Sequence, residues 1–169
     1  MAFPAFFSVK GTKQGQFKGE AKEAGRADRW IAVRYFAMEL ESPRDAASGL
    51  PTGKRQWKPI KVVKEWGAAS PQGLTACATN ELLSEVVFEF MRTDASGVEY
   101  VYQTLTLTEA TIADVVRFTG GPEALMPGGK RASFEESEEL EAWSFTFRKI
   151  QLADKDGATA FADDWMRTT

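Results

Sequence analysis

Apolar and polar residues alternate along several stretches of this chain with a period of two, the pattern of β-strands. In residues 85–92, Val86 and Phe88 fall on one side of the pattern and acidic residues fall on the other. A turn signal, DASG, follows at 94–97, and the alternation then resumes over 99–108. These stretches predict a β-hairpin with one half-buried face.

Further stretches predict strands in other parts of the chain. They cover residues 5–10, 30–40, 57–66, 111–118, 142–152 and 158–165. The stretch 30–40 has apolar residues on both faces, which predicts a strand that is covered on both sides. Three long connections separate these elements, at 11–28, 42–56 and 121–138. Loops of such length in a compact domain are usually functional or disordered.

One short helix is predicted between the strands. Ser70 is expected to be its N-cap and Pro71 its first residue, because a missing N–H has no consequence at that position. Residues 72–79 follow, and Asn80 is expected to end the helix. The residues expected to face the sheets are Leu74, Cys77 and Ala78.

Many short strands with one helix predict a mainly β fold class: two antiparallel sheets that form a β-barrel or sandwich, with one short α-helix. With 169 residues, the chain fits a single domain that spans 1–169. No apolar run approaches the about 18 residues of a membrane span, so membrane insertion is not expected. The first ten residues lack the basic region of a secretory signal peptide.

The composition excludes most common reaction centres. The chain has no histidine, which excludes Ser-His-Asp and Cys-His catalysis and His-ligated zinc. A single cysteine, Cys77, excludes an internal disulfide and is expected to be a small core residue. No catalytic residue, metal or cofactor is therefore expected.

Charge is distributed in blocks, although the net charge is only −3. A basic stripe comprises Lys54, Arg55, Lys58, Lys61 and Lys64, and an acidic run comprises Glu135, Glu136, Glu138, Glu139 and Glu141. Such blocks usually mark solvated faces, and in a self-associating protein they can form opposite sides of one interface. Because the net charge is negative, nucleic-acid binding through the basic stripe is not expected.

Two adjacent carboxylates near the end of the chain, Asp163 and Asp164, suggest acid–base chemistry or a metal site. Neighbouring residues on a strand point to opposite faces, however, so these two are not expected to converge on one atom. The tail is instead expected to dock through Phe161 and Trp165 and to leave its charges on the rim.

Several short motifs follow one another in a fixed order. They are TGKR at 52–55, KP at 58–59, SP at 70–71, SFTFRKI at 144–150 and DDW at 163–165. With these motifs, the sequence from Phe7 to Trp165 resembles the haemolysin-coregulated protein (Hcp) family, the tube protein of bacterial type VI secretion systems. The chain departs from the family pattern at Trp57, where His is common, and at Gly67 and Ala68, where an Asp-Lys pair is common.

The resemblance implies a barrel-like fold of two sheets and a homohexameric ring with a wide central channel. It implies that rings stack into a tube, that a contractile sheath surrounds and drives the tube, and that a VgrG-type spike caps it. It further implies that secreted effectors travel in the lumen and that no cofactor is needed. The expected location is the cytoplasm during assembly and the medium after release, without a signal peptide.

Three parts of the chain are expected to form the ring or stacking interface, because a closed ring buries strand faces and edges that a lone subunit exposes. The expected residues are Val33, Tyr35, Arg44, Leu50, Lys54, Arg55, Trp57, Lys58, Asp163, Asp164 and Trp165. In the stretch 30–40, Ile31, Val33 and Tyr35 lie opposite Trp30, Phe36 and Met38 and are expected to form a second buried face.

Two alternatives stay open from the sequence. The stretch 42–58 is expected to be an extended arm that reaches a neighbouring subunit or ring, but an ordinary mobile surface loop is possible. A monomeric β-barrel that binds a small ligand is the alternative function. Such a barrel would enclose a dry cavity, whereas a tube subunit would have a core filled by side chains.

Overall fold

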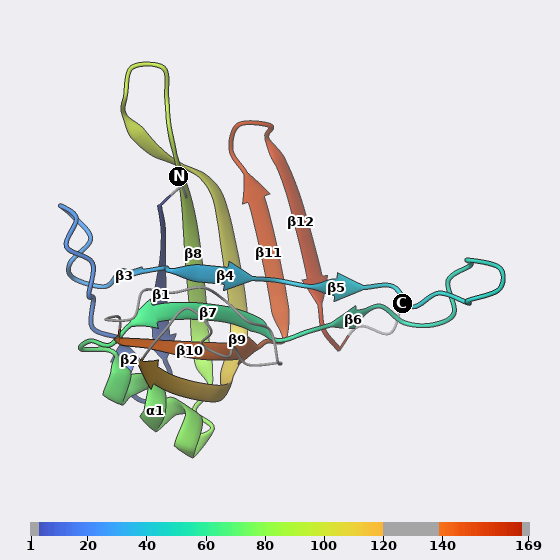
Figure 1. The fold of residues 1–169 in the computed structure, drawn as a ribbon, viewed down its shortest axis with the longest axis horizontal. Coiled ribbons are helices and arrows are strands. Elements are labelled where there is room, and N and C mark those ends of the chain that lie inside the picture. The colour runs from blue at the N-terminus through green and yellow to red at the C-terminus, as the bar shows by residue number, and fades with distance from the viewer. Residues whose placement is uncertain (1–3, 120–138, 167–169) are drawn as a thin grey trace.

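Two antiparallel β-sheets form the body of the molecule, and the predicted mainly β fold with one short helix is confirmed (Figure 1). The structure is a computed structural model that describes residues 4–119 and 139–166. Within these residues the strands form a sandwich, and their ladders do not close into a barrel. The predicted connection 121–138 lies outside the described residues.

The first sheet contains two antiparallel hairpins, the predicted one at 83–110 and a second one near the end of the chain. Its strands are β1 (Ala5–Gly11), β2 (Gly15–Gln16), β3 (Ile31–Ala32), β8 (Leu83–Thr93), the first half of β9 (Glu99–Thr119), β11 (Lys149–Asp154) and β12 (Thr159–Asp164). Strands β8 and β9 pair as the predicted hairpin. Beyond β9 the sheet continues through β11 to β12, which pairs only with β11 among the described strands.

The second sheet packs across the first. It comprises β4 (Tyr35–Ala37), β7 (Ile60–Glu65), β10 (Glu139–Thr146) and the second half of β9. Strand β9 serves both sheets, so the two strands predicted at 99–108 and 111–118 are one bent strand. The bend includes Glu109, whose φ of 53° lies in the left-handed region.

The predicted strand at 30–40 is interrupted because the chain changes sheets within it. Strand β3 pairs with β1, and β4 pairs with β7. The Val33 N–H donates to the Ala5 carbonyl, and the Arg34 N–H donates to the Val63 carbonyl in the other sheet. The face pattern expected for this stretch is therefore wrong: Ile31, Val33 and Phe36 all contact the main core.

Helix α1 (Ser70–Thr79) ends at Asn80 as predicted, with Asn80 in a left-handed conformation. The predicted cap is wrong, and of the predicted buried face only Cys77 packs against the main core. Ala69 occupies the cap position, while the Ser70 hydroxyl donates to Glu141. Leu74 is 42% exposed, and the buried side of the helix carries Gly73 and Ala76. This side packs against the large Trp143 ring, and only glycine fits at position 73 because a Cβ there would lie 2.3 Å from the ring.

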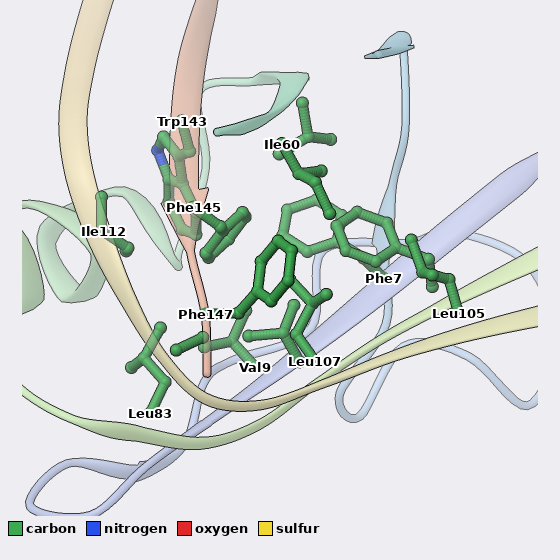
Figure 2. Packing of buried hydrophobic residues seen from close by; sticks show 14 of the residues in the cluster. Phe7, Val9, Ile60, Leu83, Leu105, Leu107, Ile112, Trp143, Phe145 and Phe147 are labelled. Atoms are coloured by element: carbon green, nitrogen blue, oxygen red, sulfur yellow. The ribbon is translucent and has the colours of Figure 1, made fainter. Parts of the chain in front are cut away.

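Aromatic side chains fill the space between the sheets (Figure 2). Phe7 stacks on Phe88 with 5.5 Å between ring centroids, and Trp143 meets Phe7 edge to face at 5.8 Å. Phe145 packs edge to face against both Phe88 and Trp143 at 6.2 Å. This interior is filled by side chains, as expected of a tube subunit rather than of a ligand-binding barrel.

A buried group of charges links the second sheet to the helix. Lys64 and Glu141 are both fully buried, and the Lys64 Nζ lies 3.0 Å from carboxylate oxygens of Glu141 and of Glu20. Arg117 Nε lies 3.0 Å from the other Glu141 oxygen. The prediction of solvated charge blocks is therefore wrong for Lys64 and Glu141, which pair across adjacent strands within the subunit.

Candidate assembly surface

An extended arm, residues 38–59, leaves the body between β4 and β7 (Figure 1). Its stem is a two-stranded ribbon of β5 (Leu40–Glu41) and β6 (Gln56–Trp57). Pro59, which lacks an N–H, separates β6 from β7. The strand predicted at 57–66 is therefore interrupted near its start. The arm projects beyond both sheets.

The arm tip, residues 42–54, has a defined turn. The Asp45 carboxylate accepts hydrogen bonds from the Ser48 N–H and hydroxyl, both at 2.7 Å, and these bonds hold the pKa of Asp45 below its usual value. Backbone bonds from Asp45 to Leu50 and from Thr52 to Pro43 close the turn. Leu50 is 63% exposed on this turn, so the tip presents an apolar side chain to solvent.

The root of the arm is joined to β12 by a clamp of Arg55, Trp57 and Asp163. The Arg55 guanidinium donates to both Asp163 carboxylate oxygens and, at 2.7 Å, to the Asp164 carbonyl. The Trp57 indole N–H donates to Asp163 at 2.9 Å. The hydrogen bond from Arg55 lowers the pKa of Asp163, so this carboxylate is ionised at neutral pH.

Aromatic rings surround the clamp. Trp57 is buried and meets Phe147 edge to face at 5.4 Å between centroids, and Trp165 meets the same ring at 4.9 Å. The tail therefore docks through Trp165, while Phe161 contacts the Trp57 ring at 6.3 Å between centroids and stays 43% exposed. The expectation that the tail leaves both charges on its rim is wrong for Asp163, which the guanidinium of Arg55 holds at the arm root.

Asp163 and Asp164 do not form a joint site. The Asp164 carboxylate accepts from the Met166 N–H and lies 3.8 Å from Arg148 Nε, away from the Asp163 pair with Arg55. No group of three metal-ligating side chains occurs in the ranges 4–119 and 139–166. In the same ranges no helix has the length and apolar character needed to cross a bilayer.

The other predicted interface residues lie in two places. Arg44, Leu50 and Lys54 are exposed on the arm tip, and Lys58 lies 3.7 Å from Glu41 on the stem. On the body, Val33 packs against the main core, while Tyr35 packs in a separate cluster with Val63 and Phe118.

Sequence reasoning missed two exposed apolar residues at the arm root as interface candidates. Met38 is 37% exposed and Leu40 is 43% exposed. The sequence could have indicated both residues, because they lie next to the stretch 42–58 that is expected to form the arm. Both lie at the end of the predicted strand 30–40, which the structure does not contain as one strand, and only Met38 has a predicted face there.

The architecture and the sequence lead to the same family. The family model described as "Type VI secretion system effector, Hcp" matches residues 6–153. The chain belongs to the Hcp family. A curated relative, the "Major exported protein" of Pseudomonas aeruginosa, is 34% identical over 174 residues, which cover 98% of this chain and 96% of the relative.

Solved Hcp structures share the fold over nearly the whole chain. One Hcp crystal structure has a TM-score of 0.82 at 25% identity and covers 97% of this chain and 100% of its own. A secreted Hcp protein of Pseudomonas aeruginosa has a TM-score of 0.75 at 28% identity, over 98% of this chain and 100% of its own.

Membership of the Hcp family confirms the resemblance and a role in type VI secretion as a secreted tube protein, not an enzyme. The family implies self-assembly into rings. One departure from the family pattern also gains a structural role. Trp57, at the position where His is common, supplies the indole N–H that binds Asp163.

Proposed function

We propose that residues 1–169 form one tube domain, and that six copies close into a ring whose stacking builds the inner tube of a type VI secretion system. A contractile sheath surrounds this tube, a VgrG-type spike caps it, and effectors travel in its lumen. The chain assembles in the cytoplasm and leaves through the secretion system. Its role is mechanical, as a building block of the conduit.

The observation that carries the proposal is the ordered arm on a member of a ring-forming family. The clamp fixes the direction of the arm, while Leu40 and Leu50 remain exposed along it. A fixed, projecting element with exposed apolar side chains is typical of a surface that contacts another copy of the chain. A mobile surface loop would not be held in one direction by a clamp.

The predicted interface residues have different roles under this proposal. Arg44, Leu50 and Lys54 on the arm tip contact a neighbouring copy. The clamp residues Arg55, Trp57 and Asp163 hold the arm in position for that contact, together with the backbone carbonyl of Asp164 and the side chains of Trp165 and Lys58. Tyr35 on the body is a candidate for the contact within the ring, and Val33 supports the fold beneath it.

Sedimentation velocity over a wide concentration range tests the proposal. The intact chain is expected to sediment as a ring and as larger stacks. A variant that lacks residues 46–53 is expected to keep the ring and to lose the stacks, because the deletion removes the arm tip and leaves the clamp. A chain that sediments as a monomer at every concentration would contradict the proposed function.

A further inference from the structure

The inner face of the first sheet is not fully covered by the second. Hairpins β8–β9 and β11–β12 extend past β4, as Figure 1 shows. Where β4 crosses them lies a hollow of about 270 Å³ that is lined mainly by Phe36, Met38, Phe90, Tyr102, Leu105 and Leu152. The lining residues come from β4 and the segment just after it, from β8, from β9 and from β11.

A second hollow adjoins the first. It shares Gln103 and Leu152 with the first hollow and extends to Phe161 on β12. We call the two hollows together the trough. Its lining is more apolar than polar, and two of its residues, Met38 and Phe161, are among the more exposed large apolar residues of the described chain. Exposed apolar surface of this kind marks a contact site.

One carboxylate, that of Asp154, lines the trough on the β11–β12 side. Asp154 accepts hydrogen bonds from Gln103 Nε2 at 2.9 Å and from the Gly157 N–H at 2.7 Å, and these bonds lower its pKa. Asp156, two residues further along, lies 3.4 Å from Arg92 and is outside the lining of the trough. Asp154 therefore offers a negative charge to an incoming cation at this end of the trough.

The arm tip has the complementary chemistry. Leu50 is an exposed apolar side chain on a closed turn, and the cations Arg44 and Lys54 lie within the same tip. The first hollow has a volume of about 270 Å³ and the second about 250 Å³, so the trough has room for an apolar side chain such as that of Leu50. The tip lies far out along the arm, away from the trough of its own subunit (Figure 1).

We propose that the trough of one copy receives the arm tip of a copy in the next ring, with Leu50 in the hollow and the cations Arg44 and Lys54 toward Asp154. The inference rests on the proposed function, because it names the surface that the arm contacts. The clamp then acts as a positioning device that presents Leu50 at a fixed distance and direction from the ring. Apolar contact supplies the attraction, and the charges set the orientation.

A disulfide between two different copies tests the contact directly. Two variants are made in a Cys77→Ser background, one with Leu50→Cys and one with Met38→Cys, and they are mixed under oxidising conditions. Their mixed disulfide is expected to form within stacked rings and to be identified by peptide mass. Val98→Cys replaces Met38→Cys in the control, because Val98 is 59% exposed at the far end of the β8–β9 hairpin.

Two substitutions of Leu50 provide an independent measurement. Leu50→Glu is expected to weaken stacking about tenfold or more, since it removes one buried leucine contact per subunit. Leu50→Met, which keeps the apolar volume, is expected to stack like the unaltered chain. Ring formation should be equal in both variants.

The outcomes separate the inference from the proposed function. Stacked rings in which the Leu50→Cys chain joins Met38→Cys and not Val98→Cys support the inference. Stacked rings without that disulfide, or stacks that tolerate Leu50→Glu, overturn the inference and leave the tube function standing. A chain that forms no rings overturns both.

Discussion

Arg55 and Asp163 are 108 positions apart in the chain, yet the guanidinium of Arg55 lies across the carboxylate of Asp163. This contact joins the root of the arm to the last strand of the first sheet. The arm therefore has its direction before any partner binds. An element that is ordered in advance loses less conformational entropy on association, which favours assembly at lower concentrations.

Asp163→Asn is expected to loosen the arm root without unfolding the body. The substitution removes the ionic partner of Arg55 and weakens the acceptor of the Trp57 indole. Hydrogen exchange at Leu40 and Trp57, which pair in the stem, should become several-fold faster, while exchange in β8 should stay unchanged. Asp164→Asn is the matched control, because the side chain of Asp164 lies outside the clamp.

The clamp should respond to acid in a defined range. The hydrogen bond from Arg55 lowers the pKa of Asp163 in the folded chain. The clamp therefore contributes its full stabilisation above the unfolded pKa of Asp163, about 3.9. This stabilisation is lost as the pH falls through the lower pKa of the folded chain. The Trp57 indole resonance in NMR spectra should be constant from pH 8 to about pH 4 and should shift only below that. Since the chain has no histidine, a shift near pH 6 would contradict this assignment.

The fold class was predictable from the sequence because alternation marks strands directly. The bent strand β9 was not, since Glu109 is an ordinary residue by type and only tertiary pairing places it at a positive φ. The interruption at Val33 and Arg34 was hidden for a related reason. Apolar residues on both faces fit either one strand covered on two sides or a chain that passes from one sheet to another.

Gly73→Ala should lower the free energy of unfolding by about 1–3 kcal/mol, because the added methyl group would overlap the Trp143 ring. Denaturation by urea, followed by tryptophan fluorescence, measures this change. Gly53→Ala on the arm tip is the control. No heavy atom lies within 4 Å of a Cβ at that position, so the free energy of unfolding should change by no more than about 0.5 kcal/mol.

Lys64→Met should destabilise the subunit strongly, by about 3–5 kcal/mol, because it leaves the buried carboxylate of Glu141 with less compensating charge. Glu65→Gln alters the neighbouring Arg34 pair, which is exposed, and should change the free energy of unfolding by at most about 1 kcal/mol. Guanidinium denaturation measures the free energy of unfolding of both variants. Equal losses in the two variants would contradict a stabilising role of the Lys64–Glu141 pair.

The candidate site was only partly visible in the sequence. The letters TGKRQW and DDW showed that a basic arm and an acidic tail exist, but linear order could not show that Arg55 and Asp163 bind each other within one subunit. The exposure of Lys64 and Glu141 was predicted wrongly for the same reason. A charge block suggests solvent exposure until the strand register places opposite charges side by side in the interior.

Electron microscopy of the purified chain in negative stain shows directly whether the chain forms rings. We expect annular particles with six-fold symmetry and a hollow centre, some of them stacked into short tubes. Uniform small particles without a central channel, at concentrations where the chain is fully folded, would contradict this expectation.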